Sequence, residues 1–224
     1  MRSLRHDRQV DPSRPEAGRV IARLVTALRR EGLRFFTRRL AAAARRGAGY
    51  QRLVVFRATP SGRAEPHAAV RELSPAEATQ LTTIPWDPAT IEARHREGAR
   101  LFAASDGTAH TSFGWVTDGR SMWVDETSCY LTSREPKIWI WDCVTPAEFR
   151  GRGQYPMLLR GILRQLGHSR AVIYCRAENR SSRRGIEKAG FAAGESIIRL
   201  RRRVWVRRRG TGDAVAVSDD PNIR

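Results

Sequence analysis

Apolar and polar residues alternate along this chain of 224 residues with two periods, one typical of helices and one typical of strands. In residues 15–46, Val20, Leu24 and Leu28 recur at every fourth position, and arginines occupy the other faces. This spacing predicts a basic amphipathic helix, which can dock on its own domain or lie on an acidic membrane surface. The Gly-Ala-Gly sequence at 47–49 marks a boundary after it.

Shorter apolar runs follow from residue 52, and their composition predicts strands. The expected strands span 52–58, 67–73, 99–105, 110–116, 121–127 and 137–145. The sequences DGT and TDGR, which precede the fourth and the fifth of these runs, are typical of hairpin turns. The last run, KIWIWDCVT, is apolar on both faces, which indicates a central strand covered on both sides.

Helices are expected before and after this meander of strands. Ser74, Pro75 and Glu77 form a capping-box pattern, and Asp87 with Pro88 repeats the combination of a cap and a proline. Beyond the central strand the expected elements are a helix to residue 167, a strand at 171–177, a helix at 180–190 and a β-rich basic run at 196–209. This order predicts an α+β fold with a mixed, mostly antiparallel central sheet flanked by helices.

The expected domain organisation has three parts. A basic N-terminal arm and helix span 1–47, one folded domain spans 50–209, and 210–224 form a disordered tail. The chain carries no apolar run long enough for a membrane span and no secretory signal. Its three cysteines lack metal-binding spacing, so we expect free thiols in the cytoplasm, with the basic helix able to contact the inner face of the membrane.

The formal net charge of +18 admits two interpretations. It fits an anionic partner such as phosphate, acidic lipid, an acidic carrier protein or RNA. However, only two of the 41 basic residues are lysines, so the arginine bias of a GC-rich genome is an equal alternative and weakens the case for nucleic acid.

Candidate chemistry begins at residues 149–159, FRGRGQYPMLL, where two glycines alternate with arginines at the entrance to a helix. The first amides of a helix have no internal partner and carry the positive end of its dipole. Those of residues 152–155 could therefore converge on a pyrophosphate, with Arg150 and Arg152 adding charge. Gly-Arg-Gly turns are common, so a plain turn is the alternative.

Three segments together resemble the GCN5-related N-acetyltransferases (the GNAT superfamily). They are the strand at 138–146, the segment FRGRGQYPMLL and the segment Asn179–Phe191, and the resemblance covers about residues 67–205. In that family a segment R/Q-x-x-G-x-G/A wraps the pyrophosphate of acetyl-CoA. This chain departs from the family at Tyr155, which replaces the last small residue, and at Ile186, where many members carry the tyrosine that protonates the leaving thiolate.

The resemblance implies an acyl-CoA-dependent transferase in which an amine attacks the acetyl thioester directly, with no metal. It implies that the backbone N–H of Val144 polarises the thioester carbonyl and that Asn179 holds the pantetheine arm. The residues it assigns to acetyl-CoA, or to another acyl-CoA, are Cys143, Val144, Thr145, Arg150, Gly151, Arg152, Gly153, Gln154, Tyr155, Asn179 and Ser182.

Catalysis also needs proton transfer to and from the reactants. Asp142 ends a very apolar strand, where burial would raise its pKa and suit it as a general base, although a structural carboxylate is an equal alternative. Tyr155 or Tyr174 could supply the proton that Ile186 cannot. Cys143 lacks a neighbouring histidine, which argues against a nucleophilic thiol.

An acceptor pocket is expected beside the central strand. Its candidate residues are Trp115, Trp123, Asp125 and Trp141, although core packing is an alternative for the tryptophans. These features favour an N-acetyltransferase for a small amine or an amino sugar. Transfer to a protein or a charged tRNA remains open, as does a non-catalytic nucleic-acid or membrane-binding module with RLRRRVWVRRR as its surface. The same C-terminal run is also compatible with a homodimer.

Overall fold

The computed structural model describes residues 49–58, 69–166, 171–201, 203–207 and 215–218. The chain divides into two units, Met1–Gly49 and Tyr50–Arg224, at the glycine-rich boundary. The basic arm and helix predicted over 1–47 lie outside the described residues.

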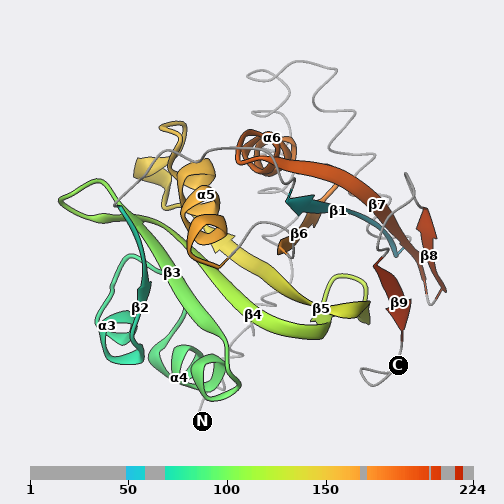
Figure 1. Ribbon diagram of the computed structural model, residues 1–224, viewed down its shortest axis with the longest axis horizontal. Coiled ribbons are helices and arrows are strands. Elements are labelled where there is room, and N and C mark those ends of the chain that lie inside the picture. The colour runs from blue at the N-terminus through green and yellow to red at the C-terminus, as the bar shows by residue number, and fades with distance from the viewer. Residues whose placement is uncertain (1–48, 59–68, 167–170, 202, 208–214, 219–224) are drawn as a thin grey trace, which may run out of the picture. The chain divides into compact units, whose positions relative to one another are not determined.

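The described residues of the second unit form a sheet of nine strands with helices packed against it (Figure 1). The strands are β1 (Tyr50–Ala58), β2 (Val70–Leu73), β3 (Arg100–Ser105), β4 (His110–Val124), β5 (Cys129–Val144), β6 (Ala171–Arg176), β7 (Phe191–Leu200), β8 (Arg203–Arg207) and β9 (Ala216–Ser218). The helices are α3 (Pro75–Thr79), α4 (Pro88–Arg96), α5 (Gln154–Leu166) and α6 (Arg180–Lys188), with a 3-10 turn η1 at Ala147–Phe149.

The strand order is β2-β3-β4-β5-β6-β1-β7-β8, with β9 beside β5. β5 and β6 run parallel, and the other neighbouring pairs in this sheet are antiparallel. The predicted fold class, a mixed and mostly antiparallel sheet flanked by helices, is therefore confirmed. None of the helices in the described part of the chain is both long and apolar enough to cross a bilayer.

Both faces of the sheet carry core residues, because its central strands are apolar on both sides. On one face α5 buries Leu158 and Ile162, and α6 buries Ile186, against a cluster that includes Ile140 of β5. On the other face Ile91 of α4 packs with strands β3 and β4. These contacts confirm that 137–145 belongs to a central strand covered on both sides.

The parallel pair β5–β6 is short, and this shapes the site. Pairing joins Ile138 to Ala171, Trp139 to Val172 and Ile140 to Ile173. Beyond these residues β5 continues to Val144 and β6 to Arg176 without mutual pairing. The two strands therefore part at their carboxyl ends, the edge at which helices α5 and α6 begin.

Four details of the sheet differ from the sequence-based expectation. TDGR does not form a hairpin, because β4 runs through it as one strand with a register shift between Gly119 and Ser121. Arg100 of β3 donates to Asp118 at 2.6 Å, which holds this Asp-Gly pair within the sheet. β5 begins at Cys129, eight residues earlier than the predicted strand start at 137 (137 − 129).

The C-terminal run also differs from its prediction. The chain reverses at Arg201, whose φ is 55°, so the run forms the antiparallel pair β7–β8 rather than one strand. The predicted disordered tail contains β9, and Val215 beside it is only 1% exposed. Ala216 and Val217 pair with β5, and Val215 and Val217 pack in the core beside it, so the prediction of disorder is wrong for 215–218.

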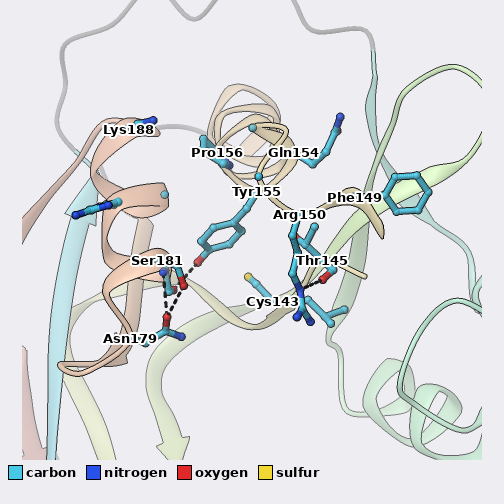
Figure 2. Close-up of a pocket in the computed structure, with 16 residues that line it drawn as sticks. Cys143, Thr145, Phe149, Arg150, Gln154, Tyr155, Pro156, Asn179, Ser181 and Lys188 are labelled. Carbon is cyan, nitrogen blue, oxygen red and sulfur yellow. Dashed lines mark hydrogen bonds between the residues drawn. The ribbon is translucent and has the colours of Figure 1, made fainter. Parts of the chain in front are cut away.

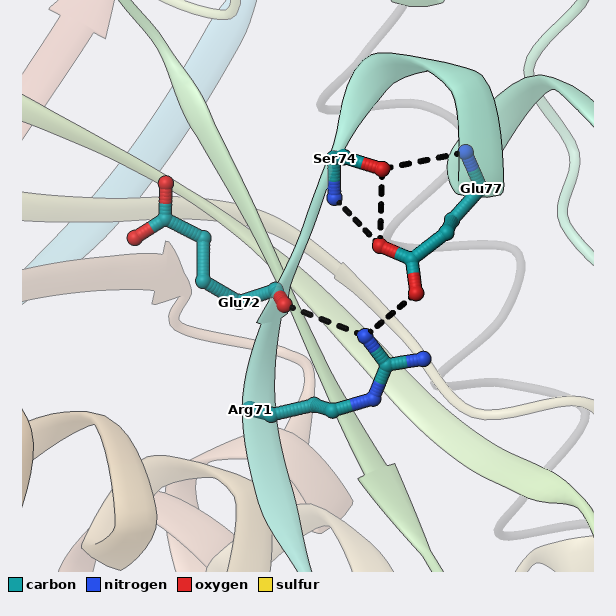
Figure 3. A network of polar contacts seen from close by, with 4 residues as sticks. All are labelled: Arg71, Glu72, Ser74 and Glu77. Atoms are coloured by element: carbon teal, nitrogen blue, oxygen red, sulfur yellow. Dashed lines mark hydrogen bonds and ion pairs between the residues drawn. The ribbon is translucent and has the colours of Figure 1, made fainter.

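The capping box predicted for α3 is present (Figure 3). The Ser74 hydroxyl accepts from the Glu77 amide at 3.3 Å, and the Ser74 amide donates to the Glu77 carboxylate at 2.8 Å. Arg71 of β2 adds a 2.7 Å ion pair to the same carboxylate. Asp87 caps α4 in the same manner by accepting from the Thr90 amide at 2.9 Å.

The Glu77 network predicts a pH-dependent effect of Glu77→Gln on stability. Hydrogen bonds from Ser74, first that of its amide, and the charge of Arg71 lower the pKa of Glu77 from 4.5 to about 2. Because the folded pKa is the lower one, the stabilisation is present above pH 4.5 and is lost as the pH falls towards 2. The variant should melt below the wild type at pH 6 and equally with it near pH 2. A gap that persists at low pH would contradict this account, and the exposed Glu92→Gln is the control.

Candidate active site

The loop between β5 and α5 has the geometry of an anion-binding turn (Figure 2). Gly151 and Gly153 have φ values of 77° and 79°, a region that favours glycine, and helix α5 starts at the next residue, Gln154. A Cβ added to either glycine would meet no atom within 4 Å, so the loop backbone is accessible on that side. The free amides at the start of α5 and the positive end of its dipole therefore face open space that an anion can enter.

A cavity of about 620 Å³ lies against this loop. Its walls come from the end of β5, the loop, the start of α5 and one face of α6, and the residues are Cys143, Val144, Thr145, Phe149, Arg150, Gly151, Gly153, Gln154, Tyr155, Pro156, Asn179, Ser181, Ser182, Arg184, Gly185 and Lys188. Ten of the eleven residues that the resemblance assigned to the acyl-CoA thus lie in one place. The structure does not bring the eleventh, Arg152, to the cavity.

Some of the charged residues that line this cavity were predicted from the sequence, and others were not. Arg150 folds back and donates from Nε to the Thr145 carbonyl at 2.9 Å, which ties the loop to the end of β5. Arg184 and Lys188 on α6 also line the cavity and were missed from the sequence. Their spacing of four residues on a predicted helix, beginning five residues after Asn179, was the available signal.

The edge of β5 that faces the cavity is shaped by a β-bulge. Trp115 of β4 pairs with Trp141, but Phe113 pairs with Val144, so β5 has one extra residue here. Asp142 absorbs it with a φ of 43°. Gly114 makes room, because a Cβ there would lie 2.9 Å from the Cys143 Sγ. The bulge therefore turns Cys143 and Val144 towards the gap between β5 and β6.

Asn179 connects the cavity to α6. Its side-chain oxygen caps the helix by accepting from the Ser182 amide at 3.1 Å and from the Ser181 hydroxyl at 2.9 Å. This leaves the side-chain NH2 group as the donor that can meet a carbonyl of a bound molecule. The sequence-based assignment of Asn179 and Ser182 to the cofactor side is therefore compatible with their positions.

Tyr155 projects from the first turn of α5 into the gap between α5 and α6, away from the glycine loop (Figure 2). Its hydroxyl lies 3.4 Å from the Ser182 hydroxyl, and its ring packs on Gly185, where a Cβ would come within 2.5 Å of Cδ1. Burial first, and then the neighbouring Cys143, raise the pKa of Tyr155 well above its usual range. Tyr155 thus stays protonated and leaves the phosphate side of the loop open.

The Cys143 thiol is a poor nucleophile in this setting. Burial, with a smaller contribution from the charge of Asp142, raises the pKa of Cys143 to about 12. At pH 8 roughly one molecule in 10,000 then carries the thiolate. We expect the native protein to resist alkylation of Cys143 by iodoacetamide and the denatured protein to be labelled, as read by peptide mass spectrometry. Rapid native labelling of Cys143 would show a reactive thiol and contradict this geometry.

A second cavity, of about 710 Å³, shares Cys143, Tyr155, Asn179 and Ser182 with the first. It also contains carboxylates and aromatic rings, and its further residues are Gln51, Arg94, Asp125, Glu126, Trp141, Asp142, Ile173, Tyr174, Cys175 and Arg176. Burial, and then the charges of Glu126, Asp125 and Asp142, raise the pKa of Tyr174. The two cavities meet where β5 and β6 part, with the glycine loop in the wall of the first and the carboxylates in the wall of the second.

Two of the four predicted acceptor residues, Asp125 and Trp141, line this second cavity. Trp115 does not, because it is fully buried between Trp86 and Trp141. Trp123 lies on the surface and donates to Asp125 at 2.7 Å. The sequence identified the strands correctly, but the bulge and the register decide which tryptophan side chains reach the cavity.

Asp142 is not the buried carboxylate that the sequence indicated. Its side chain is 44% exposed, and it accepts at 2.8 Å from both Arg94 and the Trp86 indole. Arg94 itself stacks on Trp86, Trp115 and Trp141, with its guanidinium 4.7 to 5.4 Å from the ring centroids. This cluster fastens α4 to the bulge, so the contacts of Asp142 are those of a structural carboxylate.

No group of three or more His, Cys, Asp or Glu side chains within the described ranges is placed to hold a metal ion. None of the three cysteines, Cys129, Cys143 and Cys175, forms a disulfide.

Comparisons with known proteins give similarity in three dimensions only. No protein-family model and no curated protein sequence matches the chain. One similar solved structure is a protein assigned to the GNAT acetyltransferases from Novosphingobium aromaticivorans, with 16% identity, a TM-score of 0.46 and 66% of this chain covered. The match spans 62% of that protein, so this chain corresponds to only part of its length.

Two further solved structures are similar to the chain. A GNAT-family acetyltransferase from Colwellia psychrerythraea has 9% identity and a TM-score of 0.43, covering 85% of this chain and 74% of that one. Glucosamine-6-phosphate N-acetyltransferase from Arabidopsis thaliana has 16% identity and a TM-score of 0.37, covering 55% and 90%. Because all these identities are low, the chemistry of this chain has to be inferred from its own residues.

Proposed function

We propose that this chain is an acyl-CoA-dependent N-acetyltransferase whose acceptor is a small amine. One observation carries the proposal: two cavities meet where β5 and β6 part, one bordered by a glycine loop at a helix start and the other by carboxylates. A transferase that joins an extended phosphorylated donor to an amine needs this arrangement, with the thioester at the junction.

The first cavity fits the donor. The free amides after Gly153 and the charges of Arg150, Arg184 and Lys188 suit a pyrophosphate and its neighbouring phosphate. Cys143 and Val144 at the end of β5, and Thr145 after them, have no β6 partner, so they offer backbone groups to the amides of a pantetheine arm. Acetyl-CoA, as substrate, would supply the acetyl group.

The junction supports direct transfer. The amine nitrogen bonds to the thioester carbonyl carbon, and the carbon–sulfur bond breaks. The Val144 amide, beyond the bulge, is the proposed donor to the carbonyl oxygen, and Tyr155 gives its proton to the departing thiolate. The proton lost by the amine passes to a carboxylate of the second cavity, for which we choose Glu126, because its ion pair with Arg176 is 3.7 Å long whereas that of Asp142 with Arg94 is 2.8 Å.

The second cavity supports an amine that carries a positive charge. Asp125, Glu126 and Asp142 line it together with Trp141, and Arg94 and Arg176 offset two of these charges. Carboxylates attract ammonium groups. Diamines and amino sugars are therefore the first acceptors to test.

The test is release of free thiol from acetyl-CoA in the presence of a panel of amines, with acetylated product identified by mass spectrometry. We expect at least one diamine or amino sugar to be acetylated, and Glu126→Gln to reduce turnover more than the control Glu97→Gln on the surface. Binding of acetyl-CoA without acetylation of any amine in the panel would overturn the choice of acceptor.

A second candidate rests on the hairpin β7–β8. Trp205 is 46% exposed and lies between the exposed Arg203 and Arg207 on one face of β8. Alternating arginine and tryptophan side chains suit a polyanion, so an acceptor carried on tRNA is the alternative proposal. It requires RNA binding that weakens steeply with salt and with Trp205→Ala.

A further inference from the structure

A third cavity, which shares no residue with the two above, lies between α6 and strands β1 and β7. Its volume is about 120 Å³, and it is lined by Arg52, Val54, Ala177, Arg183, Ala193, Gly194 and Ser196. Arg52 of β1 and Arg183 of α6 thus line a space that is much smaller than the two cavities proposed for acetyl-CoA and the amine. The cavity has no role in the proposed acetyl transfer.

The cavity is formed by a second β-bulge, in β7. Val54 of β1 pairs with Ser196, but Phe56 pairs with Ala193, so β7 has one extra residue opposite β1. Gly194 sits in this bulge, and a Cβ there would lie 2.7 Å from the Arg57 Nη1. The bulge and the missing side chain therefore bring a third guanidinium, that of Arg57, against the cavity wall.

Positive charge exceeds negative charge around this cavity. Arg57 pairs with the Glu195 carboxylate, which is 4% exposed, and within the described ranges neither Arg52 nor Arg183 forms an ion pair with a carboxylate. Arg52 instead donates to the Ser196 hydroxyl at 3.3 Å, and Arg183 donates to the Ala177 carbonyl at 3.4 Å. Both of these bonds are long and have neutral acceptors.

The unmatched donors are shielded from solvent. Within the described ranges, no acceptor meets the buried Nε–H groups of Arg52, Arg57 and Arg183. Buried donors of charged groups are costly when unpaired, and native structures rarely leave several together. Within the described ranges Arg52 and Arg183 therefore lack an acceptor that carries negative charge, while the Glu195 Oε2 atom beside Arg57 is a buried acceptor without a donor.

We propose that this cavity is a binding site for a small oxyanion with the chemistry of phosphate or sulfate. Its volume equals that of about four waters at roughly 30 Å³ each, which accommodates a tetrahedral ion of five heavy atoms. Guanidinium groups from β1 and α6 approach the space from two sides and match oxyanion oxygens in geometry and charge. The ion would join α6 to the sheet on the side away from the glycine loop.

The test is calorimetric titration of the full chain with inorganic phosphate, and separately with sulfate and acetate, at constant ionic strength. Arg52→Gln and Arg183→Gln should each weaken phosphate binding about tenfold or more, since each removes a charge-assisted bond. Arg120→Gln, an exposed arginine on β4, is the matched control and should leave binding unchanged. Preference for phosphate or sulfate over acetate would support a tetrahedral ligand.

The glycine loop can also attract phosphate, so the same titration is made in a Gly153→Asp background. Phosphate binding that persists there and is lost on adding Arg52→Gln supports the proposal. The proposal is overturned if phosphate binding disappears with Gly153→Asp alone or is unchanged by Arg52→Gln. It is also overturned if the wild-type chain binds no phosphate. Ser196→Ala is the second variant in case an arginine variant fails to fold, and it should weaken phosphate binding by displacing Arg52.

Discussion

Replacing Gly153 with aspartate is expected to weaken acetyl-CoA binding about 100-fold or more, because each charge-assisted bond to phosphate is worth about 1.5–3 kcal/mol. The new carboxylate would stand in the open space beside the helix start and repel the pyrophosphate. The φ of 79° adds strain for any residue with a side chain. Calorimetry with acetyl-CoA measures the loss.

A matched control separates the phosphate effect from the backbone effect. Gly107, in the turn between β3 and β4, also has a positive φ, 98°, and an added Cβ there would likewise meet nothing within 4 Å. Gly107→Asp should therefore cost comparable stability and leave acetyl-CoA binding intact. Equal loss of binding in both variants would show that Gly153 acts through folding alone.

Replacing Tyr155 with phenylalanine is expected to lower turnover by about 100-fold or more, the range typical of a general acid or base, with little change in KM. The ring, which packs on Gly185, is retained, so the variant removes the hydroxyl beside Ser182 and little else. Steady-state kinetics with the best acceptor from the amine panel gives kcat and KM separately.

The pH profile gives a second readout for Tyr155. Because burial raises the pKa of Tyr155 well above its usual range, the wild type should not lose activity through ionisation of this tyrosine near pH 10. Tyr130→Phe, where the ring packs against the surface residue Trp123, is the control and should leave kcat unchanged. If kcat falls no further in Tyr155→Phe than in this control, another group protonates the thiolate.

The sequence predicted the fold class and most elements because their signals are local. The capping pattern at Ser74 and Glu77 fixes the start of α3, and the apolar run at 137–145 identifies the central strand. The predicted strand boundaries were wrong where pairing between distant strands decides them. TDGR reads as a turn, but pairing with β5 extends β4 through it, and β9 forms because its apolar residues meet β5.

The sequence predicted the residues of the proposed donor cavity well and those of the proposed acceptor cavity less well. Gly151 and Gly153 are neighbours in the sequence, so they lie together wherever the loop forms. The wall of a cavity comes from several strands, and the register of those strands decides which residues face the cavity. The bulge at Asp142 exposes that residue to Arg94 and decides that Trp141 rather than Trp115 reaches the second cavity. A bulge leaves no clear signal in the order of apolar and polar residues.

Calorimetric titration of the wild-type chain with acetyl-CoA, with S-acetylpantetheine alongside, tests the central claim most directly. The loop at the start of α5 should contribute most of the affinity, since its amides and Arg150 meet the pyrophosphate. The account predicts one acetyl-CoA per chain and binding of S-acetylpantetheine, which lacks that group, weaker by about 100-fold or more. Absence of acetyl-CoA binding, or equal affinity for the two, would contradict the assignment of the loop as a phosphate cradle.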